Sequence, residues 1–236
     1  MFIRTESFKE FIRYYPVVTG IVAIHLVLFL AAFLPFFPVY ELMAGVNIYI
    51  IQGELWRLVT PIFVHAGFAH MLFNSFSLVL FGPALERMLG KWRFLLIYLA
   101  CGITANVATL LLKPPVYVHV GSSGAIFGLF GVYIAMIVFR RELMSYQNAQ
   151  IIITIAAIAF VMTFLQPNIN VTAHLFGFLG GFVFGSIVLG RGRELSRSIR
   201  TFSEKAARST TSGPMTPQKL IFIILAILAI IGLLSR

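Results

Sequence analysis

Long apolar segments recur along almost the whole chain, and they constrain its fold more than any other feature. Such segments cover residues 17–37, 62–85, 93–112, 121–139, 149–166, 171–190 and 219–234. A membrane-spanning helix needs about 20 mostly apolar residues, and inside a bilayer only helices and closed barrels satisfy their own backbone hydrogen bonds. We therefore predict an all-α polytopic membrane protein, with a bundle of six helices and a seventh, C-terminal transmembrane helix.

The segments between these spans divide the chain into four expected parts. Residues 1–16 are mixed and basic and are interpreted as an N-terminal segment on the cytoplasmic membrane surface. Residues 17–190 form the six-helix core, and its first apolar run is too long for a typical signal peptide. Residues 191–217 are polar and read as a cytoplasmic linker, and residues 218–236 hold the seventh span.

The basic residues indicate membrane topology. The chain has a formal net charge of +10, which by itself would suggest a nucleic-acid partner. With the N-terminus in the cytoplasm, however, 15 of the 18 Lys and Arg residues fall on the cytoplasmic side, which is the positive-inside pattern. We therefore expect no nucleic acid, and an integral, multi-pass protein of a bacterial plasma membrane, since no organelle-targeting extension is present.

A serine flanked by glycines opens the fourth apolar segment, in the run Gly121-Ser122-Ser123-Gly124-Ala125-Ile126-Phe127-Gly128. Glycine lets a second backbone or a substrate come close, and the start of a helix offers unpaired N–H groups to a developing anion. This arrangement is one way to present a nucleophile. Small residues at a spacing of four also let membrane helices pack, so the run alone leaves both interpretations open.

Three polar residues are expected at one depth in the membrane. His70, Ser123 and His174 each precede an arginine at the inner end of their span by 17 residues. At a rise of about 1.5 Å per residue, each lies roughly 25 Å above the cytoplasmic charges. The three side chains therefore fall in one layer near the outer boundary of the hydrocarbon core, where polar groups are costly and usually functional.

A serine and a histidine in one layer suggest a nucleophile and its general base. A triad would need a carboxylate to orient the histidine, but the chain has no aspartate, and Glu86 is expected near the inner surface. The sequence therefore predicts a Ser123–His174 dyad. The absence of aspartate excludes an aspartyl intramembrane protease and disfavours a transporter that uses buried carboxylates, and the absence of an H-E-x-x-H motif disfavours a zinc protease.

Four motifs resemble those of the rhomboid family of intramembrane serine proteases, over residues 17–190. The spacing His65-x4-His70-x3-Asn74 resembles the family's motif on the second span. Gly121-Ser122-Ser123-Gly124 resembles G-x-S-G on the fourth span, and Ala173-His174-x2-Gly177 resembles A-H-x2-G on the sixth. Trp56-Arg57 is similar to the W-R of the first loop. The seventh span is similar to that of the family's "six plus one" variant.

The resemblance implies a role for each motif residue. Ser123 would be the nucleophile and His174 the general base, and Asn74 and His70 would donate side-chain hydrogen bonds to the oxyanion beside the Ser123 N–H. Phe127 takes the position where some members stack a tyrosine on the histidine. The supporting positions are His65, Trp56, Arg57, Gly121, Gly124 and Gly177. The resemblance implies neither a metal nor a cofactor.

The resemblance also implies partners, namely the lipid bilayer and the transmembrane segments of other proteins, cut near their outer ends. Residues 149–166 would act as a lateral gate and residues 166–170 as a cap over the site. Glycines at 177, 181 and 185 would bring the sixth span close to the fourth. The alternative is a catalytically inactive rhomboid-like protein that binds membrane clients; such proteins usually lose a motif residue, and none is lost here. Oligomeric state and substrate identity are left open.

Overall fold

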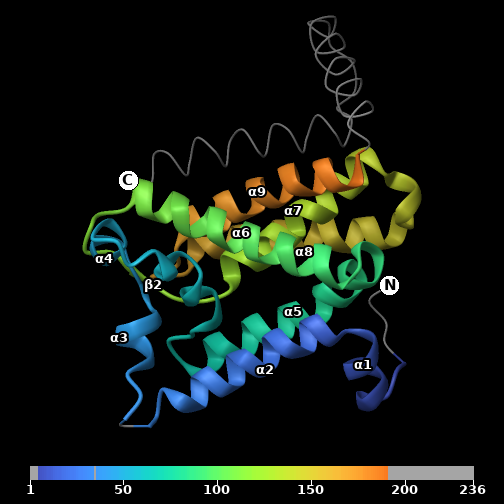
Figure 1. Ribbon diagram of the computed structural model, residues 1–236. Helices are drawn as coiled ribbons and strands as arrows, with labels where there is room; N and C mark the ends of the chain where they lie inside the picture. Colours follow the sequence, from blue (N-terminus) through green and yellow to red (C-terminus); the bar gives the residue numbers. More distant parts are fainter. Residues whose placement is uncertain (1–4, 35, 191–236) are drawn as a thin grey trace, which may run out of the picture.

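The computed structural model describes residues 5–34 and 36–190, and it shows a bundle of long helices running along a shared direction (Figure 1). The linker and the seventh span predicted for residues 191–236 lie outside the described residues. The long helices of the described residues are α2 (Pro16–Ala31), α5 (Phe68–Leu89), α6 (Lys91–Leu112), α7 (Ser123–Phe139), α8 (Tyr146–Leu165) and α9 (Val171–Leu189). In the described part, the only strands are β1 (Gly45–Val46) and β2 (Val118–His119), which pair antiparallel. The fold is all-α, as predicted.

Among residues 5–34 and 36–190, four helices are long and apolar enough to cross a membrane, namely α5, α6, α8 and α9. Helix α2 passes that test only together with the short α1 (Phe8–Tyr14), from which it is bent by 108°. Helix α7 is apolar, but with 17 residues it is too short to pass that test by itself. The described part is therefore polytopic, whereas helix length alone does not establish the six core spans expected from the sequence, because α2 and α7 are shorter than their apolar runs.

Helix α7 lies at the centre of the bundle. Every residue from Gly124 to Met136 is buried, which is expected of a helix that is apolar all round. Helices α5, α6, α8 and α9 all pack against it. The hydroxyl of Tyr133 donates a hydrogen bond of 2.6 Å to the carbonyl oxygen of Phe81, so a buried polar contact also ties α7 to α5. The first residue of this central helix is Ser123.

Helices α7 and α9 approach each other backbone to backbone. A Cβ atom on Gly177 would overlap the carbonyl oxygen of Gly124, and a Cβ atom on Gly181 would overlap that of Gly128. Only residues without a side chain allow two membrane helices to come this close. The close approach predicted from the glycine repeat is confirmed, and it joins the helix that starts at Ser123 to the helix that carries His174.

The short elements gather at the two ends of the bundle (Figure 1). One end, where α7 begins, holds β1, β2, α3 (Val39–Met43), α4 (Asn47–Ile51) and the 3-10 helices η1 (Leu55–Leu58) and η2 (Thr60–Phe63). The opposite end holds α1 and the connection from α7 to α8, which includes the 3-10 helix η3 (Arg141–Leu143).

Glu86 is a structural residue at the end of the bundle that holds α1. Its side chain is only 2% exposed, and its two carboxylate oxygens accept hydrogen bonds of 2.9 Å from the N–H groups of Val17 and Val18. These are the first N–H groups of α2, which carry the positive end of the helix dipole. The carboxylate therefore stabilises the contact between α2 and α5, and it is committed to that contact.

Candidate active site

A loop that depends on a glycine places Ser123 at the first position of α7. Gly121 has a φ of 116°, a conformation that glycine adopts readily and other residues do not. The N–H of Gly121 donates to the carbonyl oxygen of Pro61 at 2.8 Å, which ties the loop to η2. Because α7 begins at Ser123, the N–H of Ser123 belongs to the first turn, whose amides lack partners within the helix. These amides can donate to an anion.

The two neighbouring serines have different environments. Ser122 is 0% exposed, and its hydroxyl lies 3.4 Å from Nε2 of His65. Ser123 is only partly buried. A nucleophile has to be reached by its substrate, so of the two hydroxyls that of Ser123 is the accessible one.

His174 is held against the face of α7 that carries Ser123. The imidazole is 6% exposed and stacks on the ring of Phe127, with centroids 4.1 Å apart and an angle of 16° between the planes. Phe127 follows Ser123 by four residues, so the two side chains share one face of α7. No hydrogen bond joins Ser123 to His174 in the described part of the chain, and such bonds are often long in a protease without substrate.

His70 and Asn74 lie on α5 beside the loop that precedes Ser123. A Cβ atom on Gly121 would lie 2.6 Å from Nε2 of His70, so the imidazole packs directly on the loop backbone. The side-chain amide of Asn74 donates a hydrogen bond of 2.9 Å to the carbonyl oxygen of His70. An amide has two hydrogens to donate, so one remains for another acceptor. The structure thus brings His70 into contact with the serine loop, with Asn74 one turn further along α5.

His65 belongs to a row of three imidazoles. Its ring centroid lies 4.5 Å from that of His25 and 5.1 Å from that of His70. His25 is fully buried on α2, and its Nδ1 lies 3.1 Å from the hydroxyl of Ser75. The motifs in the sequence include neither His25 nor Ser75, because nothing in an isolated histidine on the first span indicates that it packs beside the second span.

Trp56 and Arg57 stabilise the long first loop. The guanidinium of Arg57 is buried, donates to the carbonyl oxygens of Glu41 and Ala44 at 2.6 and 2.7 Å, and pairs with the Glu54 carboxylate at 2.5 Å. The indole N–H of Trp56 donates to another carbonyl of the same loop. Both residues therefore act on the loop that covers the end of the bundle where α7 begins.

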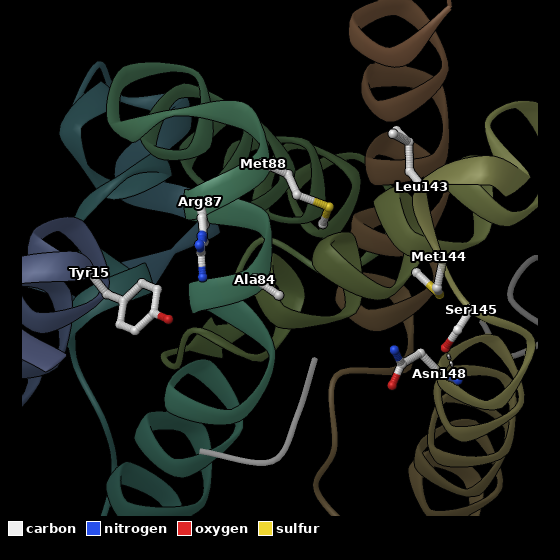
Figure 2. Close-up of a pocket in the computed structure, with 8 residues that line it drawn as sticks. All are labelled: Tyr15, Ala84, Arg87, Met88, Leu143, Met144, Ser145 and Asn148. Carbon is white, nitrogen blue, oxygen red and sulfur yellow. Dashed lines mark hydrogen bonds between the residues drawn. The ribbon is translucent and has the colours of Figure 1, made fainter. Parts of the chain in front are cut away.

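A pocket of about 260 Å³ lies at the opposite end of the bundle, between α5 and the start of α8 (Figure 2). Its lining residues are Tyr15, Ala84, Arg87, Met88, Leu143, Met144, Ser145 and Asn148. It contains neither a histidine nor the glycine-flanked serine, so it is separate from the candidate active site. Within the described ranges, no group of three or more His, Cys, Asp or Glu side chains is arranged to hold a metal ion.

The fold and this site define a helical, multi-pass membrane protein with a serine and a histidine on two closely packed helices. Residues 52–191 match the family model of the Rhomboid domain. The protein named "Putative rhomboid protease YdcA" of Bacillus subtilis (strain 168) is 55% identical to this chain over 186 residues. These residues cover 78% of this chain and 94% of YdcA.

Two other relatives share less of their length with this chain. Rhomboid protease GluP, also of Bacillus subtilis (strain 168), is 43% identical over 144 residues, which cover 61% of this chain and 28% of GluP. RHOMBOID-like protein 6, mitochondrial, of Arabidopsis thaliana is 30% identical over 187 residues, which cover 78% of this chain and 60% of that protein. The chain belongs to the rhomboid family. It is a rhomboid serine protease and an integral membrane protein.

Proposed function

We propose that this protease cuts the transmembrane segments of other membrane proteins near their outer ends, with a Ser123–His174 dyad. The observation that carries this proposal is the stack of His174 on Phe127, four residues after Ser123 on the same helix face. The glycine contact between α7 and α9 supports it as well, because Gly124 follows Ser123 directly and Gly177 follows His174 by three residues.

In the acylation step, Ser123 Oγ attacks the carbonyl carbon of the scissile peptide bond while Nε2 of His174 takes the hydroxyl proton. The carbonyl oxygen becomes an oxyanion, which accepts hydrogen bonds from the Ser123 N–H, the second amide hydrogen of Asn74 and the His70 imidazole. Collapse of this intermediate breaks the C–N bond, and His174 returns the proton to the leaving amine.

Deacylation repeats these steps with water as the nucleophile. His174 takes a proton from the water, the hydroxide adds to the ester carbon, and the bond to Ser123 Oγ breaks as the proton returns to that oxygen. Water has to reach a site at the end of the bundle, and Ser123 is only partly buried there. Residues 166–170, which follow α8 at that end, form the cap in this proposal.

The arrangement in the membrane is part of the same proposal. The N-terminus and the end of the bundle that holds Arg87 face the cytoplasm of a bacterium, and the end that holds Ser123 faces outward. Residues 17–190 form the protease core, residues 191–217 a cytoplasmic linker, and residues 218–236 a seventh span. The partners are the bilayer and the transmembrane substrates, with no nucleic acid.

The experiment that tests the dyad is reaction of the purified protein in liposomes with a fluorophosphonate probe, followed by peptide mapping. We expect one labelled peptide, with the probe on Ser123. The His174→Asn variant should label at least about 10²-fold more slowly, because Ser123 then lacks its base. Labelling at another serine, or equal labelling of His174→Asn, would contradict the proposed dyad. No labelling of the wild type would contradict Ser123 as the nucleophile.

A further inference from the structure

The catalytic histidine of the proposed dyad has a hydrogen-bonding partner that no motif includes. Nδ1 of His174 lies 2.8 Å from the hydroxyl oxygen of Thr163, in a contact that is buried from solvent. Thr163 lies on α8, near the end of that helix, and is 2% exposed. In the described part of the chain, this is the side chain that occupies the position of a triad's third member.

The surroundings of Thr163 show which group donates the hydrogen bond between Nδ1 of His174 and the Thr163 hydroxyl. Its hydroxyl oxygen also lies 2.9 Å from the carbonyl oxygen of Ala159 one turn earlier on α8. A carbonyl oxygen only accepts, and a threonine hydroxyl has a single hydrogen, so that hydrogen is directed to Ala159. Both short contacts are satisfied only if Nδ1–H of His174 donates to Thr163, since the network decides which imidazole nitrogen carries the proton.

This assignment has a direct chemical consequence. With the proton on Nδ1, the lone pair of a neutral His174 lies on Nε2, the nitrogen that has to accept the proton of Ser123. When His174 is protonated during the reaction, the Nδ1–H still donates to an oxygen whose own hydrogen points away towards Ala159. A neutral hydroxyl stabilises the cation less than a carboxylate does, but it fixes the same tautomer and ring orientation.

A second side chain of α8, Phe160, contacts the ring on which His174 stacks. Phe160 precedes Thr163 by three residues, so both lie on one face of α8. The ring of Phe160 meets the ring of Phe127 edge to face, with centroids 4.9 Å apart, and Phe127 in turn stacks on His174. Of the two contacts that orient the imidazole, the hydrogen bond therefore comes directly from α8, and the stack on Phe127 is supported by a ring of α8.

Helix α8 is less buried than α7 and α9, and a second ring contact holds it, between Phe160 and Phe178 of α9 with centroids 5.0 Å apart. Its buried residues form a single stripe, which consists of Ile152, Ala156, Phe160 and Thr163. The pair of α7 and α9, by contrast, is locked by backbone contact at Gly177 and Gly181. A lateral movement of α8 would therefore leave Ser123 and His174 on their helices and would remove Thr163 from Nδ1.

We propose that Thr163 is a positioning residue that fixes the tautomer of His174, and that it makes the competence of the base depend on the position of α8. This proposal rests on the Ser123–His174 dyad. It implies that a substrate which displaces α8 to enter also releases His174, and that cleavage follows only after α8 has returned to its place. Thr163 thus couples access to the site with activation of the base.

The kinetic test compares three variants in fluorophosphonate labelling of Ser123, a reaction in which the Oγ–P bond forms, fluoride leaves and His174 takes the proton. Thr163→Val keeps the shape and removes the hydroxyl, so we expect the maximal labelling rate to fall about 10- to 100-fold with the half-saturating probe concentration unchanged. Thr163→Ser should stay within about threefold of the wild type, because it keeps the hydroxyl.

The matched control is Thr104→Val on α6. Its hydroxyl donates to the carbonyl oxygen of Ala100 at 2.8 Å, the same contact one turn back along the helix that Thr163 makes, and its side chain lies against Gly180 instead of His174. Thr104→Val should label at the wild-type rate. Wild-type labelling by Thr163→Val, or equal losses in Thr163→Val and Thr163→Ser, would overturn the proposal.

A second measurement reads the tautomer without any need for activity. The sample is the Ser123→Ala protein with ¹⁵N-labelled histidine. The His174 signals are assigned by their loss in Ser123→Ala/His174→Asn. The spectrum should show the proton of His174 on Nδ1. Adding Thr163→Val should shift His174 towards a mixture of both tautomers. A proton on Nε2 in the protein with Thr163 intact would overturn the role of Thr163. A wild type that does not react with the probe would instead count against the dyad, and the spectrum would still decide the tautomer.

Discussion

The imidazole of His174 lies nearly parallel to the phenyl ring of Phe127, with a centroid separation of 4.1 Å and 16° between the planes. This contact crosses from α9 to α7, and it sets the imidazole beside the helix turn that begins with Ser123. A ring that stacks on a histidine limits its rotation without using either nitrogen, so both nitrogens stay available for hydrogen bonds. Substitution of Phe127 therefore tests whether this stack orients His174.

Phe127→Ala should reduce cleavage although phenylalanine carries no polar atom. The substitution removes the stacking surface and leaves a cavity among buried rings, so His174 loses one of its orienting contacts. Phe127→Tyr keeps the ring and should be tolerated. Turnover of a transmembrane substrate in liposomes measures both effects, and circular dichroism checks that the variants fold. Equal turnover of Phe127→Ala and the wild type would refute the orienting role of the ring.

Ser123→Ala should abolish cleavage and leave the fold intact. It removes the hydroxyl that forms the acyl-enzyme, and the partly buried position loses only one oxygen atom. Ser122→Ala should keep most of the activity, because its buried hydroxyl faces His65 instead of the accessible side of the loop. Turnover of both variants in one liposome preparation measures the difference, and the reverse result would show that Ser122 is the nucleophile.

Asn74→Ala should lower turnover by about 10²-fold, which is the order expected when one oxyanion donor is removed. The His70→Ala variant should lose a similar amount. Neither loss should equal that of Ser123→Ala, since the N–H of Ser123 remains. The measurement is kcat at saturating substrate, with the variants compared at equal concentrations of folded protein. If the kcat of Asn74→Ala equals that of the wild type, Asn74 is not an oxyanion donor.

The motif residues could be found from the sequence because each has a fixed distance to its neighbours along one helix. The spacing of four between Ser123 and Phe127, and of three between His174 and Gly177, states which side chains share a helix face. Gly177 and Gly181 indicate where two helices approach, because the sequence shows directly which residues lack a Cβ atom. These features predicted the packing of α9 on α7 correctly.

Thr163 and His25 could not be found in this way. Thr163 reaches His174 from another helix, and a threonine near the end of an apolar run looks like any other weakly polar residue of a membrane span. Its importance comes from the lateral position of α8, which no local pattern encodes. The lengths of α2 and α7 were overestimated for a related reason. Apolar residues continue beyond the helix ends, so hydropathy shows where a chain can be buried and does not show where the helix ends.

The orientation in the membrane can be tested with single cysteines in a Cys101→Ser background. Gln166→Cys follows α8 at the end that carries the candidate active site, and Glu142→Cys lies in the exposed connection at the opposite end. A membrane-impermeant thiol reagent added to intact cells should label only the cysteine at position 166, since 15 of 18 basic residues place the other end inside. Labelling at position 142 would reverse the proposed topology.

Gly177→Ala tests whether the backbone contact between α7 and α9 positions the dyad. The new Cβ atom would overlap the carbonyl oxygen of Gly124, so the helices have to separate near the first turn of α7. Overpacking of this kind costs about 1 to 3 kcal/mol of stability, and it also moves His174 away from Ser123. We expect a lower midpoint of thermal unfolding and a loss of turnover larger than the unfolded fraction explains. The control is Gly20→Ala on α2, where an added Cβ atom meets no other atom within 4 Å. That variant should match the wild type in both measurements.

If Gly177→Ala unfolds earlier but keeps wild-type turnover while folded, the contact serves stability alone and the dyad does not depend on it.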